Sequence, residues 1–121
     1  IHLWLDFLHH DTPVFTGTER IARKFDTDVY YLDVRRERRG YYVARYELLV
    51  EHASQSSESE LTIRYFSLLE KSIRRQPAFY LWTHNRWKRT HEEFNIRYDE
   101  ETGRVDMSDL DEIKRRKGIA K

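Results

Sequence analysis

The segment from Thr12 to Arg36, TPVFTGTERIARKFDTDVYYLDVRR, constrains the fold more than any other part of the chain. It predicts an amphipathic helix that runs directly into an apolar strand. Thr16 and Glu19 have the spacing of a capping box, in which each side chain bonds the backbone N–H of the other residue. The apolar face expected for this helix consists of Ile21, Ala22 and Phe25.

The strand predicted after this helix, 29–34 (VYYLDV), is rich in β-branched and aromatic residues. It lacks a clean alternation of apolar and polar residues, which indicates burial on both faces. Residues 1–7 predict a preceding strand, so the three elements together indicate a βαβ unit of a parallel sheet. Val34→Asp is then expected to abolish folding, because an unpaired buried carboxylate costs several kcal/mol.

Two further elements follow. Gly40 separates the first strand from a second one predicted at 41–50, a pattern typical of a hairpin. After a polar loop, Ser57 and Glu60 have the spacing of another capping box. The helix expected over 59–76 carries apolar residues at helical spacing and ends before Pro77.

Composition excludes several classes of protein. The 121 residues are 39% hydrophobic and 36% charged, which indicates one small soluble domain. The net charge of +1 is no signal for nucleic acid. The absence of cysteine excludes disulfides and thiolate metal sites. No apolar run approaches the roughly 18 residues of a membrane span. Because the chain starts with Ile1 and its one methionine is Met107, we expect a piece of a longer protein.

The stretch from Lys71 to His91 contains no acidic residue and mixes basic with aromatic side chains. Such a mixture can stack on bases or lie at a membrane interface beside anionic lipid. Aromatic residues that pack on the core beside solvated charges are the equal alternative. The next segment, 92–121, is predicted to be a charged peripheral tail with a turn at Thr102-Gly103 and a short helix from Ser108.

Other candidate site residues are few. No pair of the six histidines has metal-ligand spacing, and we expect no cofactor. Asp6 ends the first predicted strand, where ligand-facing residues of open α/β sheets collect, although a turn aspartate explains it as well. Arg35 and Arg36 follow the second strand and can clamp a phosphate, with a charged hairpin turn as the alternative.

Two blocks of this sequence resemble lipid A biosynthesis acyltransferases of the lauroyl/myristoyl group. The first is DFLHHDTPVFTGTERIARKFDTDVYYLDVRR, residues 6–36, and the second is PAFYLWTHNRWKR, residues 77–89. The resemblance covers residues 3–90 and places the chain in the C-terminal portion of such an enzyme. It implies an α/β fold, a partial sheet with flanking helices, similar to the C-terminal half of glycerolipid acyltransferases. The domain then spans 1–91 and the tail 92–121.

The resemblance also implies a function. These enzymes look like inner-membrane proteins that work at the cytoplasmic face, where they transfer a fatty acyl chain from acyl carrier protein to a lipid A precursor. Their general base is the histidine of a His-x4-Asp/Glu motif, and none of the six histidines here is followed by an acidic residue at that spacing. No catalytic residue is therefore expected in this chain, and alone it should be inactive.

The site residues expected from this reading fall into two groups. Asp6, Arg35 and Arg36 would shape or charge the phosphosugar side of the cleft. Contacts to the membrane or to lipid headgroups would come from His84, Arg86, Trp87 and Lys88. The rival interpretation is a module that binds nucleic acid or an anionic surface through 71–91, and a third is a structural interaction domain. The acyltransferase reading expects an anionic membrane surface and no nucleic acid as partner.

Overall fold

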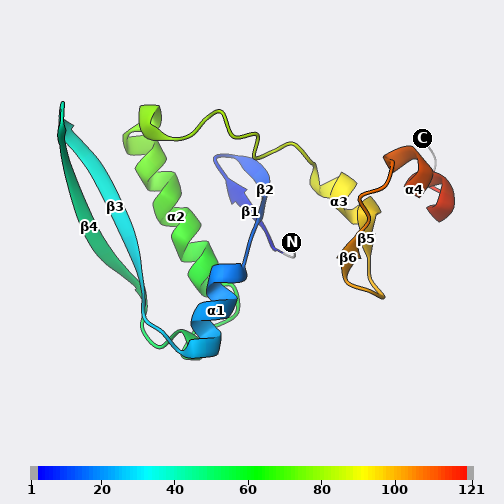
Figure 1. Cartoon of the computed structure of the whole chain (residues 1–121), viewed down its shortest axis with the longest axis horizontal. Helices are drawn as coiled ribbons and strands as arrows, with labels where there is room; N and C mark the ends of the chain where they lie inside the picture. Colours follow the sequence, from blue (N-terminus) through cyan, green and yellow to red (C-terminus); the bar gives the residue numbers. More distant parts are fainter. Residues whose placement is uncertain (1–2, 120–121) are drawn as a thin grey trace. The chain divides into compact units, whose positions relative to one another are not determined.

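The computed structural model describes residues 3–119, which form two compact units divided between Thr83 and His84 (Figure 1). The first unit contains two hairpins and a long helix. Its elements are β1 (Leu3–Phe7), β2 (His10–Val14), α1 (Gly17–Phe25), β3 (Val29–Arg38), β4 (Tyr41–Val50), η1 (Ala53–Gln55), α2 (Glu60–Arg75) and η2 (Pro77–Phe79). The second unit contains α3 (His91–Arg97), β5 (Tyr98–Asp99), β6 (Arg104–Val105) and α4 (Leu110–Lys117). No helix within residues 3–119 is long and apolar enough to cross a membrane.

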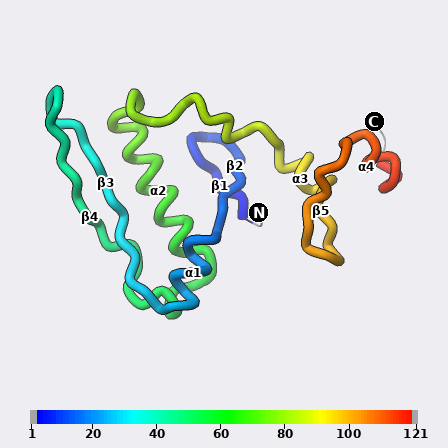
Figure 2. Tube along the Cα trace, in the orientation of Figure 1, coloured from blue at the N-terminus to red at the C-terminus, as the bar shows by residue number. Residues whose placement is uncertain are grey.

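The mixed α/β class predicted from the sequence is confirmed, but the parallel sheet is wrong. β1 pairs antiparallel with β2, and β3 pairs antiparallel with β4, as successive hairpins along the chain trace (Figure 2). Leu8 and His9 adopt positive φ values of 52° and 64°, which allow the tight turn between β1 and β2. Leu and His are unusual turn residues, so the first hairpin carries no clear signal in the sequence.

The second hairpin follows the prediction closely. β4 spans the predicted residues 41–50, and Arg39 and Gly40 form the turn, with Gly40 at φ 80°. Burial in β3 is different from the prediction, because Tyr31 and Asp33 are buried whereas Tyr30, Leu32 and Val34 are half-exposed. α2 packs against β3 and covers Tyr31 and Asp33, so the side chains of β3 alternate between buried and about half-exposed.

Helix α2 holds the first unit together. It contacts β1, β3 and β4, and it ends before Pro77 as predicted. Phe66 of α2 meets Phe7 of β1 edge to face, with ring centroids 5.4 Å apart. A core cluster joins α1, the β3–β4 hairpin, η1 and α2. It consists of Ala22, Tyr31, Leu49, Val50, Ala53 and Leu61. The expected apolar face of α1 is only partly buried, because Ile21 and Phe25 are exposed.

The capping box predicted for α1 does not form. Thr16 occupies the N-cap position, but its side chain makes no capping hydrogen bond. The carboxylate of Glu19 instead accepts the backbone N–H groups of Ser59 and Thr62, at 3.0 and 3.1 Å. Glu19 thus caps α2 rather than its own helix. At the second predicted box, Glu60 accepts the Ser57 N–H at 3.0 Å, so half of that box forms.

The second unit contains the turn and the helix predicted in the C-terminal segment. Gly103, at φ 68°, lies in the turn of the β5–β6 hairpin, and α4 begins at Leu110 behind its N-cap Asp109. Helix α3 was not predicted from the sequence. The side chain of its N-cap Thr90 accepts the backbone N–H of Glu93, and Thr90 and Glu93 have the spacing of a capping box.

Candidate anion-binding site

A buried carboxylate lies between two arginines on the face of β3 that meets α2. Asp33 is only 8% exposed, because α2 covers it. Arg35 donates its Nε–H to one Asp33 oxygen at 2.9 Å, and Arg75 of α2 donates to the other at 2.8 Å. Residues 33 and 35 share a strand face because side chains alternate along a strand. The ion pair with Arg75 fixes α2 on β3.

This network holds Asp33 ionised. Burial acts to raise the pKa of Asp33, but the hydrogen bonds from Arg35 and Arg75 outweigh it, so the pKa lies below its ordinary value. The hydroxyl of Ser72 lies 3.0 Å from that of Tyr31 and 3.5 Å from Asp33. A carboxylate that already accepts these donors is a structural anchor, whereas its arginines keep further N–H groups for a ligand.

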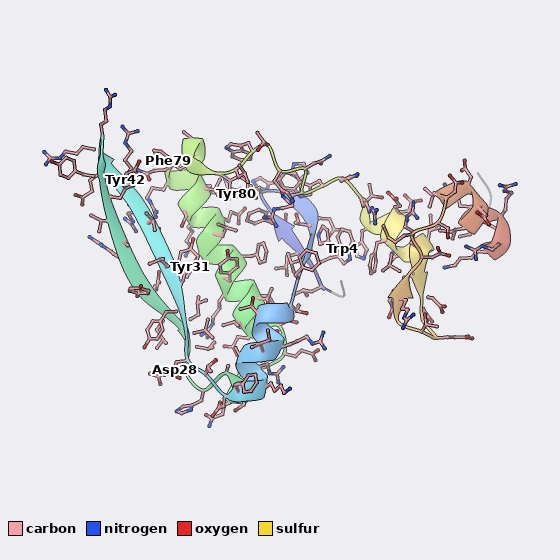
Figure 3. All side chains as sticks on the ribbon, in the orientation of Figure 1. Trp4, Asp28, Tyr31, Tyr42, Phe79 and Tyr80 are labelled. Atoms are coloured by element: carbon pink, nitrogen blue, oxygen red, sulfur yellow. The ribbon has the colours of Figure 1, made fainter. Side chains whose placement is uncertain are left out.

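Arg36 lies on the opposite face of the same strand. Its backbone N–H donates to the Gln76 side-chain oxygen at 3.3 Å, and its C=O accepts from the Gln76 side-chain nitrogen at 3.0 Å. Its guanidinium lies over the ring of Phe79, 5.8 Å from the centroid. Phe79 and Tyr80 follow the end of α2, where Figure 3 labels them.

A small cavity lies beside these arginines. It has a volume of about 120 Å³ and is lined by β3, α2 and the η2 turn, among them Val34, Ser72, Gln76 and Phe79. Arg75 lines this cavity, Arg36 lies over the ring of its Phe79, and Arg35 binds the carboxylate of Asp33 nearby. The three guanidinium groups thus outnumber the one carboxylate, Asp33, that binds two of them. The excess favours an anion, and guanidinium groups suit phosphate or carboxylate in particular.

The predicted site residues do not all come together. Arg35 and Arg36 point to opposite faces of β3, so they do not close on one atom from the same side. Asp6 is exposed on β1, opposite Asp11 of β2, and lies on the other hairpin of the unit. Sequence reasoning missed Asp33, Arg75 and Gln76. The acid-free stretch from Lys71 contains the last two, but nothing in it shows that they meet β3.

The four residues predicted to contact lipid belong to the second unit, in a segment without regular secondary structure before α3. His84 and Lys88 are exposed, whereas Arg86 and Trp87 are half-buried. Arg86 donates its backbone N–H to the His84 carbonyl at 2.9 Å. The stretch 71–91 is thus divided between the units, and two of its cations in the first unit are paired, Arg74 with Glu70 and Arg75 with Asp33.

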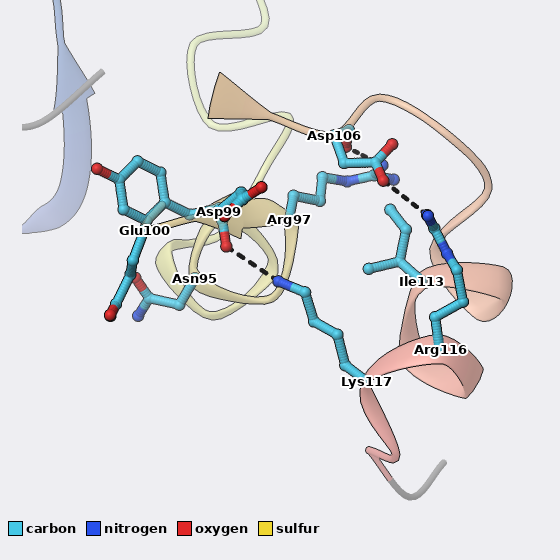
Figure 4. Close-up of a pocket in the computed structure, with 9 residues that line it drawn as sticks. Asn95, Arg97, Asp99, Glu100, Asp106, Ile113, Arg116 and Lys117 are labelled. Atoms are coloured by element: carbon cyan, nitrogen blue, oxygen red, sulfur yellow. Dashed lines mark hydrogen bonds and ion pairs between the residues drawn. The ribbon is translucent and has the colours of Figure 1, made fainter. Parts of the chain in front are cut away.

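The second unit contains a larger polar cavity of about 460 Å³ (Figure 4). Its cations bind within the unit. Arg97 donates to Glu93 and to the carbonyls of Asp106 and Ser108, and Lys117 donates to those of Ile96 and Tyr98. Arg116 donates to Asp106 at 2.6 Å. These bonds explain how a unit with so few apolar residues holds its shape.

Metal binding has no support within residues 3–119, where no group of three or more His, Asp or Glu side chains is arranged to hold an ion. Aspartate and histidine do meet at Asp26 and His52, 3.4 Å apart, but both are exposed and Asp26 also accepts from Ser54.

Comparison with known proteins decides the family. Residues 2–89 match the family model described as bacterial lipid A biosynthesis acyltransferase, which is more than half of the chain. The chain belongs to this family. The match ends where the segment 77–89 ends, so it covers the first unit and the first residues of the second. No curated protein matches the chain. No solved structure matches it either. The family implies acyltransferase activity and a lipid A-type substrate.

Proposed function

We propose that this chain is part of an enzyme that transfers a fatty acyl chain from acyl carrier protein to a lipid A precursor, and that its own task is to bind the phosphosugar of the acceptor. The observation that carries the proposal is the surplus of guanidinium groups around Asp33, beside the cavity at the end of α2. Asp33 orients Arg35 and Arg75, while Arg36 approaches from the other face. Together they offer cations to a headgroup that wraps the edge of β3. Asp6 would contact the sugar from the other hairpin.

Binding of glucosamine 1-phosphate, measured by calorimetry, tests this task. Arg36→Gln removes the charge and leaves a shorter polar side chain, so we expect affinity to fall about tenfold, as for a lost charge-assisted hydrogen bond. Arg39→Gln in the exposed hairpin turn is the matched control and should leave affinity unchanged. Equal losses in both variants would show general charge attraction instead. Inorganic phosphate, run in parallel, shows whether the sugar contributes.

Catalysis requires a residue that this chain does not supply. Proton removal from the acceptor hydroxyl by a positioned histidine contributes about 10²–10⁴ in rate, and the His-x4-Asp/Glu spacing of the family's base is absent here. The 121 residues alone should therefore show no turnover with an acyl carrier protein donor and a lipid A precursor. Turnover by the isolated chain would refute the proposal that the catalytic base lies outside these 121 residues.

The proposed location is the cytoplasmic face of the bacterial inner membrane, with His84, Arg86, Trp87 and Lys88 at the lipid headgroups. Each basic residue near an anionic bilayer contributes about 1 kcal/mol. Binding to anionic vesicles should fall when Arg86 and Lys88 are both replaced by alanine and should exceed binding to single-stranded DNA of equal charge concentration. Arg115→Ala, an exposed charge of α4, is the control. Vesicle binding that survives the double substitution would mean that 84–88 is structural.

A further inference from the structure

The turn between β3 and β4 combines exposed tyrosines with exposed arginines. Residues 37–42 (ERRGYY) are all exposed, and we call them the hairpin tip. Tyr41 and Tyr42 are 56% and 62% exposed, and the guanidinium carbon of Arg38 lies 3.9 Å from the centre of the Tyr41 ring (Figure 3 labels Tyr42). Within residues 3–119, neither Arg38 nor Arg39 forms an ion pair. The hairpin tip thus presents two rings and two unpaired positive charges.

Charge is distributed unevenly along this hairpin. Residues 35–45 contain five arginines and one glutamate, whereas 26–28 and 47–51, toward the opposite end, contain four acids and no lysine or arginine. Two of those acids bond groups at that end, since Asp28 accepts the His52 N–H and Asp26 accepts the Ser54 hydroxyl. The hairpin is therefore positive toward its tip and negative at its base, a polarity that orients it in the field of an anionic surface.

These features distinguish among the partners that can cover the hairpin tip. A protein interface would have to desolvate or pair the arginines, and charged residues are depleted at interface cores. The headgroup region of an anionic bilayer offers phosphates throughout its surface, stays hydrated, and accommodates tyrosine rings. Single-stranded nucleic acid also combines phosphates with groups that stack on rings. The family implies a lipid A-type substrate, however, which favours the bilayer.

We propose that the hairpin tip docks on the headgroup region of an anionic bilayer, with its two arginines at lipid phosphates and its two tyrosines among the headgroups. Tyr42 is the cross-strand partner of Arg36, whose backbone bonds the Gln76 side chain at the end of α2. Docking in this way brings the proposed phosphosugar site to the membrane surface, where a lipid acceptor carries its headgroup. The inference rests on the proposed membrane location, but it does not require that the site binds a phosphosugar.

Single fluorescent labels test the docking, because the chain has no native cysteine and an introduced thiol is therefore unique. A polarity-sensitive dye is attached to Arg39→Cys in the hairpin tip, to Gln55→Cys in η1, beyond the base of the hairpin, or to Lys88→Cys. All three positions are exposed. Vesicles of phosphatidylglycerol and phosphatidylcholine in equal parts are then added to the full chain. We expect the emission from position 39 to shift to shorter wavelength, although this label removes one tip cation, and the emission from position 55 to stay unchanged.

Removal of charge measures how much the hairpin tip contributes. Replacing Arg38 and Arg39 together by glutamine should weaken vesicle partitioning about thirtyfold, since each basic residue near an anionic surface contributes about a fivefold factor. Replacing Arg20 and Lys24 together by glutamine removes the same net charge from exposed positions of α1. This control should weaken partitioning by less than about threefold, because charges farther from the surface are screened. Far-ultraviolet circular dichroism checks that both double variants stay folded.

Several outcomes would overturn the inference. They are an unshifted label at position 39, equal shifts at positions 39 and 55, equal losses in the two double variants, and a label at position 39 that responds to single-stranded DNA but not to vesicles. A shift at position 88 without one at position 39 would confine membrane contact to the segment 84–88 and equally refute docking through the tip. Binding of glucosamine 1-phosphate is measured without vesicles. A missing response at position 39 with intact binding of this sugar phosphate therefore refutes the docking alone, and the converse result refutes the phosphosugar site alone.

Discussion

The carboxylate of Glu19 accepts the backbone N–H of Thr62 at 3.1 Å, although the two residues lie 43 positions apart. Glu19 is only 3% exposed, so α1 supplies a buried cap to the first turn of α2. A negative charge there also complements the helix dipole. This single side chain connects the helix after the first hairpin with the helix that carries Arg75.

Replacing Glu19 by glutamine should therefore destabilise the first unit. Glutamine keeps the size but weakens the acceptor and removes the charge, and loss of a helix cap typically costs about 1 kcal/mol, with a buried site at the upper end near 2. Urea denaturation followed by far-ultraviolet circular dichroism measures the change. Glu58→Gln, an exposed neighbour of the same helix end, is the control and should alter stability little.

A double-mutant cycle on Asp33 and Arg75 should show coupling between β3 and α2. The two side chains meet at 2.8 Å and both are largely covered, with side-chain exposures of 11% and 32%. We expect a coupling free energy of about 1 kcal/mol from Asp33→Ala, Arg75→Ala and the double variant. Arg74→Ala, which breaks an exposed pair with Glu70, should cost less. Coupling near zero would mean that the ion pair does not anchor α2.

Val34→Asp should be tolerated, contrary to the expectation from the apolar run. Val34 is half-exposed, so the new carboxylate stays hydrated and stability should change by only about 0.5 kcal/mol. Tyr31→Ala should cost about 3 kcal/mol, because that ring is buried in the core cluster. Urea denaturation of the two variants measures both changes in stability. If Val34→Asp lost as much stability as Tyr31→Ala, β3 would be buried on both faces.

The second unit should become sensitive to acid only well below the ordinary range for aspartate. Hydrogen bonds from Ser108, aided by Arg116, lower the pKa of Asp106 from 3.8 to about 2. Because the folded pKa is depressed, the stability that Asp106 contributes is present above pH 3.8 and is lost as the pH falls toward 2. The Ser108 amide resonance should titrate with a midpoint near 2. Asp106→Asn should abolish that step, and a midpoint near 3.8 would contradict the bonds.

Local signals in the sequence predicted α1, the β3–β4 hairpin, α2 and the C-terminal turn and helix, but neither β2 nor α3. Gly40 identified the turn of the second hairpin because φ near 80° favours glycine, and Pro77 identified the end of α2 because it lacks the N–H that a helix requires. Arg35 and Arg36 were candidates because they directly follow the predicted strand 29–34, a position that the sequence shows. Each of these features depends on residues within a few positions of each other.

Tertiary structure alone decided what each element meets. Glu19 lies three residues after Thr16, so the sequence favours a local cap. In the structure its carboxylate instead accepts the backbone N–H groups of Ser59 and Thr62, which lie at the first turn of α2 and have no partner within that helix. It shows Asp33 within an apolar run with Arg35 two residues on, but the second partner of the buried carboxylate, Arg75, is brought to it only by the packing of α2. Strand direction was decided in the same way. Propensity specifies that β1 and β3 are extended, whereas the turn at Leu8-His9 and the contacts of α2 specify with which strands they pair.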